Sequence, residues 1–252
     1  MKKSLAALIA IVCLPVIAFN SYAAQEWTLT QDNVNLNLKG VSPYVEKLSS
    51  GADRLYFASE SALPDPIMVM DCNEANCTRK SITSRFGSDA TIVTLNNGTR
   101  KVFFVEMGPS GKSIKFATLG ADGLSHGAVS ALDVDGSTVS QNEGAWGVPD
   151  AVVLPDGKVR VYWVFKDPAT GKPGLPEAVI SATSTDASAT SFKRDPGFRL
   201  TGGYVDTEVL RAIDGDWVMI VSTGPGAGTQ KLYMATSVDG LTWKVNENVI
   251  SS

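Results

Sequence analysis

The sequence predicts an all-β fold from two observations. Helical periodicity is almost absent, and short runs of β-branched and aromatic residues alternate with turns rich in Gly, Asp, Asn and Pro. Hydrophobic residues make up 44% of the 252-residue chain, which is ordinary for a globular protein and excludes global disorder. Length alone allows one large domain or two small ones.

The predicted strands recur as a unit of four. Each unit has a first strand, a tight glycine-containing turn, an almost continuously apolar second strand, a third strand and a more polar fourth strand. The turn glycines are 47 to 59 residues apart, and four strands at this spacing are typical of a β-propeller blade. The second strands are Arg54–Ala58, Lys101–Val105, Val159–Phe165 and Trp217–Val221, and the fourth strand of the first unit is expected near Lys80–Arg85.

Four complete units run from about Ser42 to Ser252, so residues 24–252 are predicted to form one propeller domain. Before them, Trp27–Val34 resembles the fourth strand that begins at Trp243. Either four blades close with a redundant strand, or the pattern is that of a five-bladed propeller truncated at its C-terminal end. The repeat pattern leaves both readings open.

The first 23 residues predict a secretory signal peptide. Lys2 and Lys3 precede an apolar run from Leu5 to Phe19, and small residues surround the expected cleavage after Ala23. The run is too short for a comfortable transmembrane helix and contains Pro15. We therefore expect a protein that is exported to the periplasm or the extracellular space and is not held in a membrane after cleavage.

Export determines how the cysteines are interpreted. Cys72 and Cys77 remain after cleavage, and a pair of cysteines in an oxidising compartment is expected to form a disulfide. A redox or zinc site would need C-x-x-C spacing or further ligands, which are absent around this pair. The chain has a single histidine, His126, so no metal site and no cofactor are predicted.

The charge excludes one class of partner. The net charge is −4, and it becomes −6 once residues 1–23 are removed, so no basic excess exists to neutralise a phosphate backbone. Nucleic-acid binding is not expected, and we expect the mature protein to be a monomer.

The segment Ser237–Trp243 resembles a shortened Asp-box of the sialidase type, and Pro149–Gly157 resembles the inner-strand turn of five-bladed glycosidase propellers. The whole mature chain resembles the sialidase and arabinanase/fructosidase superfamilies of propellers at the level of blade pattern, and no single enzyme family is matched. The resemblance implies that Asp239 caps a turn on the rim and has no catalytic role. It also implies a carbohydrate or glycoconjugate as partner.

Carboxylates near the starts of the inner strands are the candidates for catalysis. Asp89, Asp150 and Asp206 are assigned to equivalent positions in three units, and Glu208 shares a strand face with Asp206. Glycoside hydrolysis needs one acid and one base or nucleophile, and carboxylates that converge on a propeller axis could supply them. The alternative is that Asp89 and Asp150 only tie neighbouring blades together. Asp206 and Glu208 form the preferred catalytic pair.

Three further residues are candidates for substrate binding. Trp146 precedes an inner strand and could stack on a sugar or pack in the core, while Arg160 and Arg211 could hold an anionic group. Ser42 stands where the resemblance implies an acid in the first blade, which weakens the case for catalysis. A non-catalytic propeller that binds a glycan or a protein is therefore the alternative to a glycosidase-like enzyme.

Overall fold

A computed structural model describes residues 35–59, 67–166, 174–212 and 215–250. The chain divides into two units, residues 1–32 and 33–252, and every described residue belongs to the second. The predicted signal peptide, the Trp27–Val34 strand and the centre of the loop after Lys166 lie outside the described residues. No helix among the residues that are described is long and apolar enough to cross a membrane.

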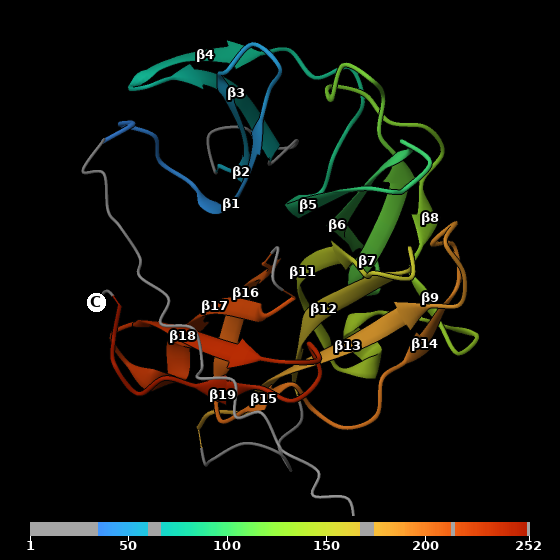
Figure 1. Ribbon diagram of the computed structural model, residues 1–252, viewed down its shortest axis with the longest axis vertical. Coiled ribbons are helices and arrows are strands. Elements are labelled where there is room, and N and C mark those ends of the chain that lie inside the picture. Colours follow the sequence, from blue (N-terminus) through green and yellow to red (C-terminus); the bar gives the residue numbers. More distant parts are fainter. Residues whose placement is uncertain (1–34, 60–66, 167–173, 213–214, 251–252) are drawn as a thin grey trace, which may run out of the picture. The chain divides into compact units, whose positions relative to one another are not determined.

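The described chain is built almost entirely from strands in four sheets, which confirms the predicted β-propeller class (Figure 1). In three of the sheets the strand order follows the sequence, from an inner strand to a polar outer strand, and the third blade departs from this order at its outer edge. Blade 1 contains β1 (Val41–Lys47), β2 (Asp53–Ala58), β3 (Ile67–Asn73) and β4 (Asn76–Lys80). Blade 2 contains β5 (Ser88–Thr94), β6 (Arg100–Gly108), β7 (Gly111–Thr118) and β8 (Ser130–Ala131).

The third blade has additional strands. It contains β11 (Ala145–Val153), β12 (Val159–Lys166), β13 (Glu177–Ser184), β14 (Phe192–Arg194) and β15 (Leu200–Thr201). The connection from blade 2 adds the hairpin β9 (Asp133–Val134) and β10 (Ser137–Thr138) beside β14, followed by the short helix η2 (Gln141–Glu143). Blade 4 contains β16 (Tyr204–Arg211), β17 (Trp217–Thr223), β18 (Leu232–Ser237) and β19 (Lys244–Val245), with the short helix η3 (Pro225–Ala227) after β17.

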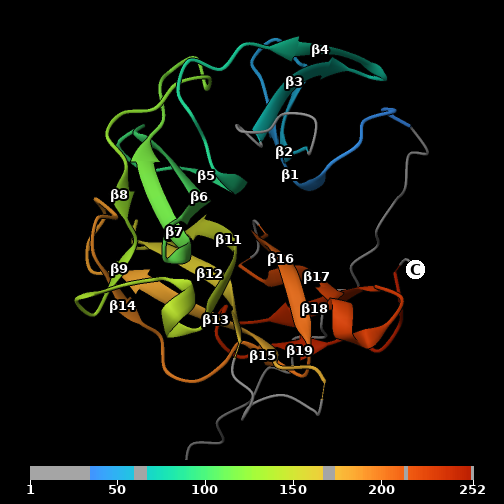
Figure 2. The same cartoon turned by 180° about the vertical axis from the view of Figure 1, so that it is seen from behind.

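The inner strands pack against one another in chain order, β1 on β5, β5 on β11 and β11 on β16. Figures 1 and 2 view the molecule from opposite sides, and both place β11 beside β5 and β16. The tight turns between the inner strand and the second strand of a blade need the left-handed backbone that glycine adopts without a steric penalty, as at Gly98 (φ +82°) and Gly157 (φ +83°).

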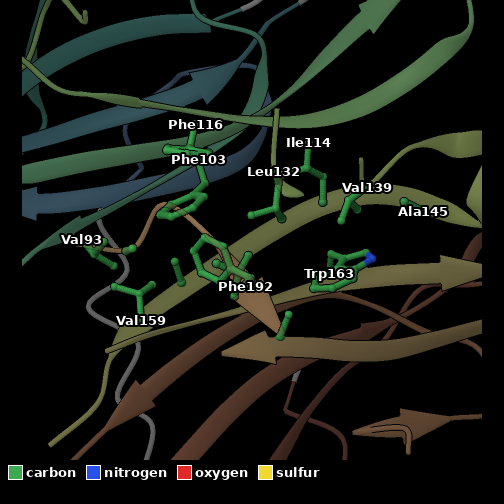
Figure 3. Close-up of a cluster of buried hydrophobic side chains, with 14 of the residues drawn as sticks. Val93, Phe103, Ile114, Phe116, Leu132, Val139, Ala145, Val159, Trp163 and Phe192 are labelled. Atoms are coloured by element: carbon green, nitrogen blue, oxygen red, sulfur yellow. The ribbon is translucent and has the colours of Figure 1, made fainter. Parts of the chain in front are cut away.

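Apolar clusters fill the seams between blades. The largest joins blades 2 and 3, where Phe103 of β6 meets Phe192 of β14 edge to face at 6.1 Å between ring centroids. Figure 3 shows this cluster running from Val93 and Val159 at one end to Val139, Ala145 and Trp163 at the other. Separate clusters fill the seam between blades 1 and 2 and the seam between blades 3 and 4.

Side chains of each second strand also hold a turn of the next blade. Arg160 Nη1 and the Tyr162 hydroxyl of blade 3 donate to the carbonyl oxygens of Asp239 and Gly240 in blade 4, at 3.0 and 2.8 Å. Within that turn, Asp239 Oδ1 accepts hydrogen bonds from the Leu241 and Thr242 amides at 2.7 Å each. In the same way, Arg54 and Tyr56 of blade 1 donate to the turn around Asp122 in blade 2. The turn at Asp239 is therefore a structural clamp.

The cysteine pair forms the predicted disulfide, and its setting refines the first blade. Cys72 and Cys77 are bonded, with Cα atoms 4.0 Å apart, and they face each other across β3 and β4. The fourth strand expected near Lys80–Arg85 was therefore placed too late, because β4 begins at Asn76. Asn73 and Asn76 pair directly, so a two-residue turn closes the hairpin and the strand starts earlier than its polar sequence indicated.

Candidate functional site

Each inner strand contains the same irregularity near its start. The residues Ser42, Asp89, Val148 and Asp206 all have a left-handed backbone, with φ between +50° and +53°, and each lies where its strand shifts register against the second strand. Such a bulge inserts one residue and redirects the side chains around it. A left-handed backbone suits Asp but is unusual for β-branched Val148. The bulge therefore positions one side chain per blade at the entrance to the inner strands.

The register corrects the assumed equivalence of the three aspartates. Asp150 pairs with Tyr162 of its second strand, as Thr91 pairs with Phe103 and Glu208 with Ile220. Asp150 therefore corresponds to Thr91 and Glu208, two residues beyond the bulge, and not to Asp89 and Asp206. The sequence-based alignment was wrong because it matched the aspartates by residue type, although Asp150 is two residues nearer to its turn glycine than Asp89 and Asp206 are to theirs.

Asp89 and Asp206 form what we call the upper layer. They come from blades 2 and 4 and are close enough for the charge of Asp89 to raise the pKa of Asp206. Burial by the surrounding protein raises that pKa most, although Asp206 remains exposed to solvent, while Lys112 lowers it. Each carboxylate accepts one side-chain hydrogen bond, from the Ser222 hydroxyl to Asp206 at 2.9 Å and from the Ser88 hydroxyl to Asp89 at 3.2 Å. Both carboxylates therefore keep acceptor positions for a substrate.

Gly147 lies in β11 of blade 3, and this blade comes between blades 2 and 4 in the sequence. A Cβ atom built on Gly147 would stand 3.9 Å from Oδ2 of Asp89 and 3.2 Å from a methyl group of Val105. The backbone of blade 3 therefore approaches the Asp89 carboxylate closely. The left-handed φ of +124° at this residue also requires glycine.

Asp150 and Glu208 lie two residues beyond the bulges and form what we call the lower layer. The Asp150 carboxylate is hydrogen-bonded to its own strand and to both neighbouring inner strands. It accepts hydrogen bonds from the Thr91 hydroxyl of β5 at 3.1 Å, from its neighbour's amide at Ala151 at 2.9 Å and from the Val209 amide of β16 at 2.5 Å. Only 3% of the residue is exposed. Burial and the nearby Glu208 carboxyl raise the pKa of Asp150 well above its usual range. Asp150 thus joins three blades and has no access to a substrate.

Glu208 is the other acid of the lower layer. It is half-buried, burial raises its pKa, and its carboxylate accepts no hydrogen bond from a described residue. Its charge also raises the pKa of Tyr44 on β1, after the larger effects of burial and of Glu46. Glu208 therefore faces the space shared by β1, β11 and β16.

Trp146 lies near the upper layer, but two lysines cover its ring. The Lys166 ammonium is 3.4 Å from the ring centroid and the Lys112 ammonium is 5.0 Å from it. Lys166 also pairs with the buried Glu177 at 3.5 Å. Stacking of a sugar on Trp146 would require these lysines to move. Lys112 was missed in the sequence because a lysine beside a surface turn has no distinctive pattern.

The two arginines lie far from the upper layer along their strands. Arg160 is 7% exposed, and its guanidinium is engaged by Thr183, Asp195 and the clamp at Asp239. Arg211 ends β16, five residues after Asp206, and stacks over Trp217 with its Cζ atom 5.9 Å from the ring centroid. At about 3.3 Å per residue, Asp206 and Arg211 are about 17 Å apart along that strand. We do not retain either arginine as a candidate for the site.

Metal-ligating side chains do not gather anywhere in the described part of the chain: no group of three or more His, Cys, Asp or Glu residues could hold a metal ion there. The acids of the two layers are spread over β5, β11 and β16. The site offers carboxylates and hydroxyls, which suit acid–base chemistry on a polar substrate.

Comparison with solved structures gives matches over most of the chain, among them xylanases and arabinanases. An endo-1,4-β-xylanase from Bacteroides thetaiotaomicron superposes with a TM-score of 0.62 at 15% identity, covering 85% of this chain and 77% of the xylanase. An endo-arabinase from the same organism has a TM-score of 0.60 at 13% identity, covering 86% and 83%.

The chain has the fold of the glycosidase-type β-propellers. A β-xylosidase/α-arabinofuranosidase from a compost metagenome, solved with xylotriose, also matches, with a TM-score of 0.56 at 12% identity and coverage of 80% and 72%. No protein-family model and no curated protein matches the sequence. At these identities the likeness concerns the fold, and the chemistry has to be argued from the residues of this chain.

Proposed function

We propose that this glycosidase-type propeller is an exported glycoside hydrolase that acts on glycans outside the cytoplasm. The observation that carries the proposal is the upper layer, where repeated bulges bring Asp89 and Asp206 from separate blades into electrostatic contact. Glycosidic bond cleavage requires two carboxyl groups, one that donates a proton and one that acts as base or nucleophile.

The environments of the two carboxyls assign their roles. Asp206 has the raised pKa, so it holds a proton to higher pH and is the general acid that protonates the leaving oxygen. Asp89 is then the base or nucleophile. Glu208 lies one layer deeper, where its charge raises the pKa of Asp150, while Asp150 holds the strands in place. This assignment replaces the pair Asp206 and Glu208 favoured by the sequence.

Export is part of the proposal. The disulfide between Cys72 and Cys77 suits an oxidising compartment, and the predicted signal peptide over residues 1–23 would deliver the chain there. Release of a mature chain beginning at Ala24, detected by mass spectrometry of the secreted protein, tests this step. Gel filtration of that protein tests whether it is a monomer.

The substrate class is tested by activity screening. The structural neighbours include a xylanase and an arabinase, so arabinan, xylan and aryl glycosides of their sugars are the first substrates, and sialosides test the sialidase resemblance. Hydrolysis that is lost in Asp206→Asn and retained in Glu247→Gln, an exposed acid of blade 4, supports the proposal. Hydrolysis that survives Asp206→Asn would remove this residue from the mechanism.

One observation favours a second function, a propeller that binds a glycan or a protein without cleaving it. The bulge of blade 1 holds Ser42 and the bulge of blade 3 holds Val148, so two of the four repeated positions carry no acid. A glycan array that shows binding without hydrolysis by the wild-type protein would select this function.

A further inference from the structure

A cavity of about 260 Å³ lies beside the face of blade 3 that packs on blade 2, and Ala145, the first residue of β11, is part of its wall. The hairpin β9–β10 and helix η2 form one side, with Ser137, Ser140 and Glu143, and blade 3 forms the other with Trp163, Phe165 and Arg194. Figure 3 shows Trp163 beside Val139 and Ala145, at the end of the buried cluster where the cavity begins. The volume lies just below the roughly 300–1,000 Å³ of sites for drug-sized ligands, which leaves room for a single sugar ring.

Arg194 is the cation of this cavity. Its guanidinium carbon lies 5.8 Å from the ring centroid of Trp163 and 5.5 Å from that of Phe165. The guanidinium forms no salt bridge and no hydrogen bond with any residue that the structure describes. Only the backbone amide of Arg194 is engaged, by the Asp135 carboxylate at 3.0 Å. The planar fork of donors is therefore available to a ligand.

A half-buried cation without an ion-pair partner is costly, and a carboxylate is the group that an arginine fork pairs with in two parallel bonds. The half-buried Phe165 suits the apolar face of a sugar ring, while Trp163 is 2% exposed and forms the buried part of the wall. The hydroxyls of Ser137 and Ser140 suit the hydroxyl groups of the sugar. The exposed acids Asp135 and Glu143 also line the cavity, so a ligand with several negative charges would be repelled.

The geometry points to a second binding site, in which Arg194 receives the carboxylate of a uronic acid residue stacked beside Trp163 and Phe165. The site is built from β9, β10, η2 and blade 3 and uses no residue of the upper layer. Its occupation is therefore independent of whether Asp89 and Asp206 carry out hydrolysis.

Glucuronate binding, followed by NMR through the indole N–H signal of Trp163, tests this site directly. We expect saturable shifts with glucuronate and at least about 10-fold weaker binding of glucose, because a charge-assisted hydrogen bond contributes roughly 1.5–3 kcal/mol. Arg194→Gln should weaken glucuronate binding to the same extent. Lys193→Gln is the matched control, since it removes the same charge from the exposed neighbouring position and should leave binding unchanged.

A second variant guards against loss of folding in Arg194→Gln. Ser137→Trp places a bulky ring into the cavity from an exposed hairpin residue and should abolish the shifts while the thermal unfolding midpoint stays at the wild-type value. The absence of saturable glucuronate binding, equal affinity for glucose, or undiminished binding by a folded Arg194→Gln protein would each overturn the assignment. Asp206→Asn should bind glucuronate at this site as the wild type does.

Discussion

The upper and lower layers of carboxylates lie two residues apart on the inner strands, yet they differ in almost every physical respect. Asp206 is open to solvent and accepts one hydrogen bond from a described hydroxyl. Asp150 is buried and accepts three hydrogen bonds, one from its own strand and one from each of the two neighbouring inner strands. The bulge causes this difference because it turns one side chain toward the entrance and the next one on that face toward the neighbouring blades. The same residue type therefore has the proposed chemical role in one layer and joins blades in the other.

The largest expected effect is on catalysis in the upper layer. Asp206→Asn removes the proposed proton donor without removing volume, so kcat/KM on the best aryl glycoside should fall about 1,000-fold. The free energy of unfolding should change little, because Asp206 is exposed and has a single hydroxyl partner. Steady-state kinetics and urea unfolding of the same preparation check both statements, with Glu247→Gln as the control.

Asp150→Asn should produce the opposite result. An asparagine amide cannot accept from all three donors around this side chain, so the free energy of unfolding should fall by roughly 3 kcal/mol. Because burial raises the pKa of Asp150 in the folded state, its stabilising contribution is full below the ordinary Asp pKa and is lost as pH rises through the folded value. Urea unfolding at several pH values should therefore show the gap between variant and wild type shrinking as pH increases.

Glu208→Gln compares the two layers within one strand, because Asp206 of the upper layer and Glu208 of the lower layer both lie in β16. Glu208 is deeper than Asp206, and its charge acts on the buried Asp150 and on Tyr44, so we expect at most about a 10-fold loss of kcat/KM. A loss as large as that of Asp206→Asn would instead restore the pair Asp206 and Glu208 that the sequence favoured. Parallel kinetics on the two variants decide between these outcomes.

The smallest expected effect concerns Lys112. Its ammonium lowers the pKa of Asp206, so Lys112→Gln should raise that pKa and keep the acid protonated to higher pH. The basic limb of the kcat/KM profile should move slightly toward alkaline pH, and the exposed Lys193→Gln should not move it. An unchanged limb would mean that Asp206 does not set it.

The sequence was sufficient for the blades because turns and apolar strands repeat with a regular period. It predicted the second strands of all four blades, the disulfide between Cys72 and Cys77 and the propeller class. It could not reveal the bulges, because Ser42, Asp89, Val148 and Asp206 represent three residue types at one backbone position and none is glycine. Asp150 was aligned by residue type with Asp89 and Asp206, although the structural role that it has in joining blades was already slightly preferred to a catalytic one.

The substrate-binding residues were harder to predict for a related reason. Arg160 is a polar residue in a second strand, which suggests recognition, yet its Nη1 donates to the clamp at Asp239 and its Nε contacts Thr183 and Asp195. Which polar groups remain free depends on contacts between blades far apart in the chain. These contacts follow from the packing of the blades and are invisible in local patterns.

A crystal structure of the Asp206→Asn protein soaked with xylotriose or an arabino-oligosaccharide tests the central claim most directly. We expect a glycosidic oxygen within hydrogen-bonding distance of residue 206 and the adjacent sugar carbon facing the Asp89 carboxylate. Sugar bound only away from both residues, or contacting Asp150, would contradict the division into a reactive upper layer and a structural lower one.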